Sequence, residues 1–395
     1  MKKETFIDNY YRERHNSDSL KWDALSERFG QADLLPLWVA DSDFSTDQHV
    51  KEALITRIEH GIFGYSKTPK DYVTAYQGWL DRHEQTQVKE EWLRFSTGVV
   101  QALYDLIACF TQESDQILIQ PPVYYPFYHA IEDQNRQLIQ APLVNKDEHY
   151  YMDFNALEAL FTTKEIKLFI LCSPHNPVGR VWRKEELHRL FSLCKAYNVL
   201  VISDEIHSDL ILTNRPFVSA LTVAKELEFE QLIVCNAPSK TFNFAGLLNA
   251  HMWFPNVQLR EAFDHWASTH RQTELSVLGQ VAAKTAYTKS DEWLATFLEI
   301  VRENEQYIRN ELTAAFPDIA ISPLEGTYLM WINLADVLNG EAVKTLVQEK
   351  AKLAIDFGEW FAKEYDTYIR INLATKPELI HQAIRQLIAA IKGER

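Results

Sequence analysis

The sequence predicts an α/β fold, with a large domain built on a mostly parallel sheet and a smaller α+β domain at the C-terminal end. Between about residues 45 and 285, segments with the spacing of amphipathic helices alternate with short, continuously apolar segments. Continuous apolar runs are typical of parallel strands that are buried on both faces. The chain also has 395 residues, which is more than one hydrophobic core usually serves, so two domains are expected.

The first helix of this pattern is expected to begin near residue 46. Ser45 or Thr46 can cap it, because a hydroxyl at that position can accept from a free backbone N–H group. Gly61 is expected to end it. Apolar side chains recur through the segment at the spacing of one helix face, namely Val50, Ala53, Leu54 and Ile58.

Four later segments are the expected strands of the large sheet: 116–120, 167–172, 199–203 and 231–235. Each is followed by polar or turn-forming residues, which read PPVYYP, SPHNPVG, DEIHSD and NAPSKTF in chain order. Ligands of open α/β sheets bind at the carboxyl ends of the strands. We therefore expect these four segments to converge on one site.

After Thr288 the pattern changes to long amphipathic helices with two strands, in TYLMWINL (327–334) and TYIRINLA (367–374). No repeat interrupts this part of the chain, and no Gly/Ser linker marks the boundary. We expect three parts, namely an N-terminal segment (1–44) that packs with the small domain, a large domain (45–287) and a small C-terminal domain (288–395).

Composition argues against several classes of protein. The net charge of -15 and the absence of a Lys/Arg block disfavour binding to nucleic acid. No apolar run approaches the ~18 residues of a membrane span, and the N-terminus lacks the apolar stretch of a signal peptide. We expect a cytoplasmic enzyme with no membrane and no metal site. The cysteines show no CxxC spacing and are expected to be reduced: Cys109, Cys172, Cys194 and Cys235.

Two residues suggest a carbonyl cofactor. Lys240, in NAPSKTFNFAG, could form an imine with an aldehyde if burial and nearby positive charge lower its pKa. Asp204 follows VLVIS and could keep the ring nitrogen of a pyridoxal group protonated. Most loop lysines are simply solvated, however, and an Asp at a strand end is more often a helix cap. The pair alone leaves both interpretations open.

Further residues could complete such a site. The amide of Asn176 could donate to a phenolic oxygen of the cofactor, although Asn-Pro is also an ordinary turn signal. Tyr124 could lie flat on its ring. Gly98 has no side chain and permits close approach of the backbone to a ligand. The free amides of Val99 and Val100 lie at the start of a helix, where a phosphate could bind.

Arg370, in YIRINLA, is a candidate for a fork of hydrogen bonds to a substrate carboxylate. A surface ion pair is an equally ordinary role for an arginine.

The motifs TGVVQAL, PPVYYP, SPHNPVGR, SDEIH, APSKTFNFAGL and YIRINLA, in this order, resemble the class I/II aminotransferases of pyridoxal-phosphate fold type I. The resemblance covers essentially the whole chain. Further segments resemble the bacterial carbon–sulfur lyases of the MalY/PatB cystathionine β-lyase and cystalysin type. These are KWDAL (21–25), LPLWVADSDF (35–44), the GIFGY segment that ends at Tyr65, His207 in DEIH, and SKTFNFAGL (239–247).

The resemblance implies a role for each site residue. Lys240 would hold pyridoxal 5'-phosphate as a Schiff base and then act as the base, Asp204 would contact the ring nitrogen, and Tyr124 would stack on the ring. Asn176 would contact cofactor and substrate, and Arg370 would bind the substrate's α-carboxylate.

Tyr65 would reach into the site of the neighbouring subunit, which implies a homodimer with shared sites.

Two departures from the aminotransferase pattern concern the phosphate. Leu248 stands where those enzymes usually have an arginine, and Ala237 replaces a common serine. The phosphate then needs other donors, for which we expect Ser239, Tyr65 of the partner subunit and the helix start at Val99 and Val100. His207 stands where aminotransferases commonly have a tyrosine, and this favours the lyase branch.

The resemblance implies β-elimination from an L-cysteine-type amino acid. Cleavage of L-cystathionine or L-cysteine would release pyruvate, ammonia and a thiol or hydrogen sulfide, as in methionine biosynthesis or sulfide production. Two alternatives stay open: an aminotransferase, which would use the same residues to form the carbanion, and a catalytically idle regulatory protein that binds the cofactor. The presence of Lys240, Asp204 and Arg370 weighs against the second.

Overall fold

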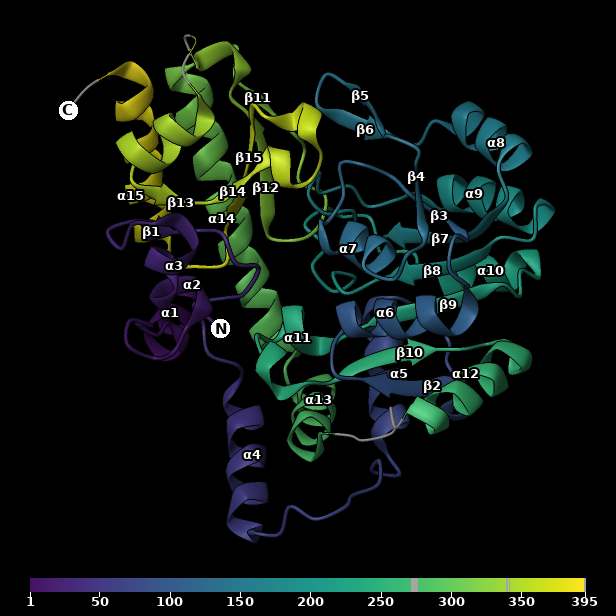
Figure 1. Ribbon diagram of the computed structural model, residues 1–395. Coiled ribbons are helices and arrows are strands. Elements are labelled where there is room, and N and C mark those ends of the chain that lie inside the picture. Colours follow the sequence, from purple (N-terminus) through teal and green to yellow (C-terminus); the bar gives the residue numbers. More distant parts are fainter. Residues whose placement is uncertain (271–275, 339, 341, 394–395) are drawn as a thin grey trace.

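The computed structural model describes residues 1–270, 276–338, 340 and 342–393. Its larger part is built on a seven-stranded sheet of order β2-β10-β9-β8-β7-β3-β4, seen on the right of Figure 1. The strands are β2 (Leu93–Ser96), β3 (Gln116–Ile119), β4 (Gln137–Gln140), β7 (Ile166–Cys172), β8 (Leu200–Asp204), β9 (Leu232–Asn236) and β10 (Ala250–Trp253).

The predicted mostly parallel sheet is confirmed. Strands β4, β3, β7, β8 and β9 pair in parallel, and β10 is antiparallel to both β9 and β2. Each of the four expected strands is present, with bounds that differ by one residue at one or both ends. In the register, Asp204 pairs with Cys172 on one side and Cys235 on the other. The carboxyl ends of β7, β8 and β9 therefore lie level.

Helices cover both faces of this sheet, which explains the continuous apolar runs. In β7, Phe169 and Leu171 face one core, whereas Leu168 and Ile170 face the other. The second core is closed by α6 (Val99–Phe110), α7 (Pro126–Glu132) and α12 (Val257–His270). The first is closed by α5 (Tyr72–His83), α8 (Phe154–Thr163), α9 (Lys184–Ala196), α10 (Ala220–Leu227) and α13 (Val277–Lys289).

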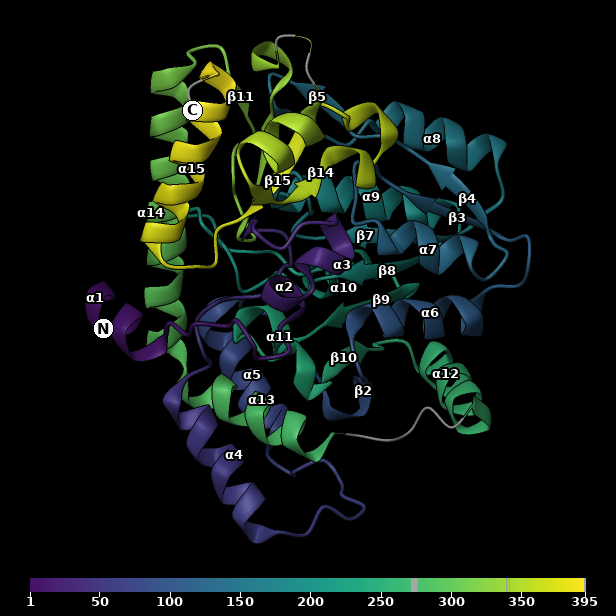
Figure 2. The same cartoon turned by 60° about the vertical axis from the view of Figure 1, so that its left-hand side comes forward.

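A second, four-stranded antiparallel sheet of order β11-β12-β15-β14 is formed by the C-terminal part of the chain. Its strands are β11 (Ala320–Ile321), β12 (Leu329–Asn333), β14 (Asp356–Phe357) and β15 (Tyr368–Asn372). Figures 1 and 2 show α14 (Asp291–Ala315) and α15 (Pro377–Lys392) side by side next to it. A separate hairpin joins β5 (Val144–Lys146) and β6 (His149–Tyr151).

The N-terminal segment lies against these C-terminal elements. Strand β1 (Leu35–Pro36) pairs in parallel with β13 (Leu353–Ala354). Helix α1 (Lys3–Tyr10) packs on α14, where the rings of Phe6 and Trp293 are 5.5 Å apart. Two short helices, α2 (Leu20–Asp23) and α3 (Leu25–Phe29), follow α1. The division of the chain at residues 44 and 287 stays our proposal.

Helix α4 runs from Gln48 to His60, and its cap differs from the expected one. The cap is Asp47, whose carboxylate accepts from the backbone N–H of His49; the expectation of Ser45 or Thr46 is wrong. Gly61 ends the helix as expected, with a positive φ of 74°.

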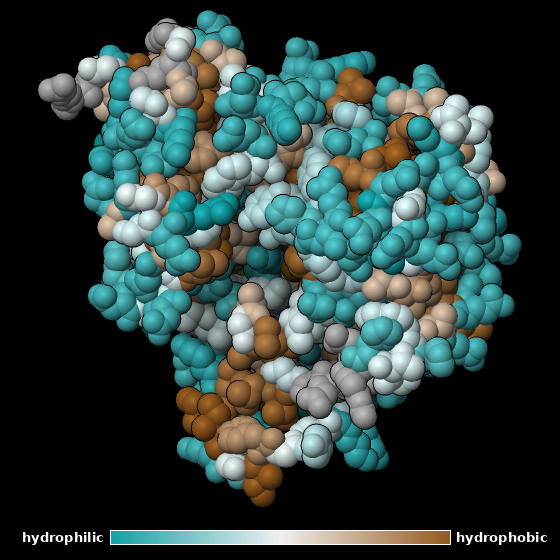
Figure 3. Space-filling view, in the orientation of Figure 1, coloured by the Kyte–Doolittle hydropathy of each residue, from teal (hydrophilic) through white to brown (hydrophobic). Residues whose placement is uncertain are grey.

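One end of α4 exposes apolar side chains. Figure 3 shows a hydrophobic area at the lower tip of the molecule, where Figure 1 places this helix. We call it the α4 surface; its members are Ile55, Ile58, Ile62 and Phe63. Across the described ranges of the chain, no helix combines the length and apolar character needed to cross a membrane.

Candidate active site

A cavity of about 200 Å³ lies at the carboxyl ends of β7, β8 and β9. It contains nine of the residues singled out from the sequence, and only Arg370 and Tyr65 lie outside its lining. Segments that are far apart in the chain thus meet at the expected edge of the sheet. The lining is Ala40, Thr97, Gly98, Val99, Val100, Tyr124, Cys172, Asn176, Asp204, Ile206, His207, Ser239, Lys240, Ala245 and Asn249.

Lys240 lies on the short helix α11 (Pro238–Thr241), directly after β9. Its Nζ donates to the backbone oxygen of Ala40 at 2.7 Å. Burial, with help from the positive charge of Arg370, lowers the pKa of Lys240 to about 8, although Asp41 and Asp204 act in the opposite direction. A substantial fraction of this amine is therefore unprotonated near neutral pH, as a nucleophile or base requires.

Asp204 is the last residue of β8 and is buried. Its Oδ1 accepts from the backbone N–H of Ile206 at 3.0 Å. Burial raises the pKa of Asp204 to about 7, and this bond and the charge of Lys240 only partly oppose that rise. A buried carboxylate of this kind is stabilised when a cation or a strong donor is placed against it.

His207 lies beside Asp204 in the loop after β8 and is buried. Burial and the positive charges of Lys240 and Arg370 lower its pKa to about 3, so the imidazole is neutral. Its Nδ1 is buried and has no hydrogen-bond partner among the described residues. A buried polar atom without a hydrogen-bond partner in a cavity wall indicates that a polar ligand contacts it.

Helix α6 opens on the cavity with an uncapped N-terminus. Gly98 precedes it in an extended conformation, and no side chain caps the first turn. A Cβ placed on Gly98 would meet no protein atom within 4 Å. The backbone amides of Val99 and Val100 thus face free space, and with the helix dipole they form an anion site.

Arg370 lies on β15 and is buried outside the cavity lining. Its Nη1 donates to Asn176 Oδ1 at 2.8 Å, and its Nη2 donates to the backbone oxygen of Trp38 at 3.3 Å. Asp356 forms an ion pair with the same guanidinium. Burial raises the pKa of Asp356 to about 6, against the lowering effect of the charge of Arg370.

Two further predicted residues differ in their placement. Tyr124 is partly buried and lines the cavity, and burial raises the pKa of its phenol. Tyr65 is fully exposed and lies away from the cavity of its own chain.

Sequence reasoning missed several residues of the site. Thr97 lines the cavity next to Gly98. It could have been predicted as a phosphate donor, because its hydroxyl precedes a helix that no side chain caps. Asn249 donates to the hydroxyl of Tyr72 at 2.9 Å and reaches the cavity wall with no motif to mark it. Asp356 was visible only as an acidic residue in an apolar segment of the small sheet.

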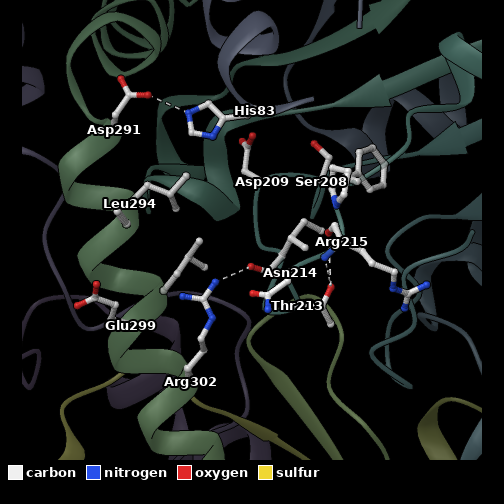
Figure 4. Close-up of a pocket in the computed structure, with 15 residues that line it drawn as sticks. His83, Ser208, Asp209, Thr213, Asn214, Arg215, Asp291, Leu294, Glu299 and Arg302 are labelled. Atoms are coloured by element: carbon white, nitrogen blue, oxygen red, sulfur yellow. Dashed lines mark hydrogen bonds and ion pairs between the residues drawn. The ribbon is translucent and has the colours of Figure 1, made fainter. Parts of the chain in front are cut away.

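A second cavity, of about 430 Å³, lies between α14 and the chain that follows β8 (Figure 4). No residue predicted for the active site lines it. Asp209 lies on its wall and accepts from Trp79 Nε1 and from the hydroxyl of Thr241, each at 2.7 Å. Thr241 is the neighbour of Lys240, so this carboxylate supports the helix that carries the lysine.

Comparison with known proteins gives consistent relatives. The family model for aminotransferase class I and II matches residues 32–387. Cystathionine β-lyase PatB of Bacillus subtilis is 34% identical over 96% of this chain and 98% of its own length. The protein MalY of Escherichia coli is 30% identical over 97% and 98%. The crystal structure of cystalysin from Treponema denticola, which contains pyridoxal 5'-phosphate, superposes with a TM-score of 0.92 at 31% identity, over 97% of this chain and 98% of that one.

The cavity fits the cofactor that the cystalysin structure contains. Lys240 offers an amine of lowered pKa, Asp204 a buried carboxylate, and His207 a ring nitrogen without a partner. The uncapped start of α6 offers an anion site. These groups match an aldehyde, a ring nitrogen, a phenolic oxygen and a phosphate. With this site, this sheet order and the match over residues 32–387, the chain belongs to the aminotransferase class I and II family.

Proposed function

We propose that the chain is a pyridoxal 5'-phosphate-dependent carbon–sulfur lyase. It cleaves L-cystathionine, L-cysteine or a related thioether amino acid by β-elimination and releases pyruvate, ammonia and a thiol or hydrogen sulfide. The observation that carries the proposal is the meeting of Lys240, Asp204 and the unpaired His207 at the uncapped start of α6. When bound, the cofactor supplies an electron-withdrawing ring that stabilises negative charge on the substrate's α-carbon.

Lys240 has two tasks in this reaction. Its lowered pKa would let the amine hold the cofactor through its aldehyde and, when free, accept the α-proton of the substrate. The carbonyl of Ala40 holds Nζ at 2.7 Å, and the hydroxyl of Tyr328 donates to the same oxygen at 3.0 Å. These contacts fix the direction from which the amine approaches.

The other cavity residues orient the cofactor. Asp204 would hold the proton on the ring nitrogen, and Tyr124 would stack on the ring. The neutral imidazole of His207 would contact the phenolic oxygen. The amides of Val99 and Val100 at the start of α6 would hold the phosphate, with a further donor from Ser239.

Arg370 and Asn176 bind the substrate's α-carboxylate. Their mutual hydrogen bond of 2.8 Å holds the guanidinium in place before substrate arrives. Asp356 balances the buried charge of Arg370, which would otherwise be costly to desolvate.

A homodimer completes the site in this proposal. The apolar α4 surface needs a cover, and it lies beside Tyr65, which is fully exposed. Exposed apolar patches of this kind mark protein–protein contacts. Tyr65 of the partner subunit would then reach the phosphate and the substrate.

The test is pyruvate release from L-cystathionine and L-cysteine by the cofactor-loaded protein without a keto acid, with thiol or sulfide measured in parallel. We expect sustained release of pyruvate, with thiol or sulfide released in an equal amount. Activity that needs an added keto acid would identify an aminotransferase, and no turnover with either assay would leave a regulatory protein. The matched control is Lys240→Ala, which should lose turnover and keep its circular dichroism spectrum. Near-normal turnover of this variant would contradict the whole assignment.

A further inference from the structure

A separate cavity of about 460 Å³ lies near Arg370, which donates to the backbone oxygen of one of its lining residues. It is lined by Leu20, Arg28, Trp38, Tyr125, His129 and Trp360. We call it the side cavity.

Two residues of its lining, Trp38 and Tyr125, contact residues of the active site. The backbone oxygen of Trp38 accepts from Arg370 Nη2 at 3.3 Å. Tyr125 directly follows Tyr124, and their rings are 5.2 Å apart. A third link is Phe361, whose ring lies 4.9 Å from the guanidinium of Arg370 and 6.1 Å from the ring of Tyr125. A substrate whose α-carboxylate is bound by Arg370 therefore begins at the wall of the side cavity.

The lining of the side cavity has a distinct chemistry. Three aromatic rings, those of Trp38, Tyr125 and Trp360, provide surfaces on which methylene groups can pack. Arg28 is the one permanent cation in the lining, which contains no carboxylate. This combination suits a flexible apolar stem that ends in an anion.

Arg28 has a charge that is available to a ligand. Its guanidinium lies over the ring of Trp360 at 4.5 Å, and this guanidinium forms no hydrogen bond or ion pair with another residue that the structure describes. Arg370, in contrast, already contacts Asn176 and Asp356. The positive charge of Arg28 also lowers the pKa of Asp356, although burial sets the net rise of that pKa. Arg28, in the lining of the side cavity, and Arg370, on β15, thus act on the same carboxylate.

We infer that the side cavity binds the leaving group of the substrate, and that Arg28 selects thioether amino acids whose leaving group carries a carboxylate. This inference rests on the proposed function. The methylenes beyond the sulfur lie on the aromatic rings, and the distal carboxylate meets the guanidinium of Arg28. A distal ammonium group faces solvent, because Leu20 and His129 at the rim are exposed.

The test compares two substrates of the same reaction. L-cystathionine carries a distal carboxylate, and S-ethyl-L-cysteine does not. In Arg28→Met, the ratio of the KM for cystathionine to the KM for S-ethyl-L-cysteine should rise about 10-fold, as expected for the loss of one charge-assisted hydrogen bond at a partly exposed site. Arg28→Lys should recover part of this loss. In the wild type, added salt should raise the KM for cystathionine more than that for S-ethyl-L-cysteine.

A matched control is Arg189→Met. Arg189 is also an exposed arginine over an aromatic ring, 4.3 Å from that of Phe154, and it lines neither cavity. Its ratio of KM values should stay at the wild-type value.

Equilibrium binding separates this inference from the proposed function. Calorimetry in the Lys240→Ala background measures the ratio of dissociation constants for the two substrates with no turnover, and adding Arg28→Met should raise it about 10-fold. An unchanged ratio would overturn the role of the side cavity. Absence of pyruvate from the wild type, with this binding ratio still shifted, would overturn the proposed function alone.

Discussion

Asp204→Asn should stabilise the cofactor-free protein while weakening its hold on the cofactor. The carboxyl group is buried at the end of β8, and its pKa rises from an ordinary value of 3.8 to about 7 on folding. A group whose pKa is higher in the folded state contributes stability at low pH, and that contribution is lost as the pH rises through the folded pKa. At neutral to basic pH, the charged Asp204 therefore destabilises the empty site.

The size of the effect follows from these two pKa values. The raised pKa of Asp204 lowers the free energy of unfolding by about 4 kcal/mol at pH 8 and by about 2 kcal/mol at pH 5.5, at 1.36 kcal/mol for each pKa unit. Asparagine does not ionise and therefore removes this penalty. Asparagine keeps an oxygen that can accept from the N–H of Ile206, so the 3.0 Å bond can survive. The same change removes the carboxylate that would contact the ring nitrogen of the cofactor.

The assay is urea unfolding of the cofactor-free protein, followed by tryptophan fluorescence at both pH values and at one protein concentration. We expect the free energy of unfolding to rise more at pH 8 than at pH 5.5. Asp318→Asn, at an exposed position, is the control and should change little at either pH. An equal rise in the free energy of unfolding at both pH values, or a fall at pH 8, would refute the reasoning.

Three further changes test other parts of the structure. Lys21→Met removes the nearer of the two cations that contact the fully buried Asp43, at 2.9 Å, and leaves Arg14 at 3.2 Å; it should lower the free energy of unfolding by about 2 kcal/mol, and adding Asp43→Asn should recover much of the loss. Asn176→Ala removes the acceptor next to Arg370, so the KM for amino-acid substrates should rise about 10-fold in steady-state kinetics, and an unchanged KM would contradict its role. Gly358→Ala places a Cβ against a backbone oxygen of the following turn and should cost about 3 kcal/mol, read as a fall in the urea midpoint; a midpoint equal to that of the wild type would show that the turn can relax.

The large sheet could be predicted because its strands are buried on both faces. The apolar run 199–202, which supplies most of β8, contains no polar residue, and the predicted range of the strand is shifted by only one residue. The cap of α4 could not be predicted in the same way. Ser45, Thr46 and Asp47 are all good caps, and only the turn of the chain in front of the helix selects among them.

The residues of the candidate site also fall into those that the sequence could predict and those that it could not. Residues at or shortly after the ends of strands of the large sheet, such as Asp204 and Asn176, meet where the strand order requires. Asp356 and Arg28 could not be placed, because their positions depend on how the two ends of the chain pack together. No local pattern in the sequence encodes that packing.

The pairing of β1 with β13 has a consequence for the order in which the protein matures. Leu35 finds its partner only at Leu353, so this contact cannot form until nearly the whole chain has left the ribosome. The carbonyl of Ala40, which holds Lys240, lies four residues after the end of β1. Contacts between residues so distant in the chain form slowly. The wall that closes the cavity is therefore completed late, and a nascent chain whose synthesis is interrupted before β13 lacks the strand that pairs with this segment.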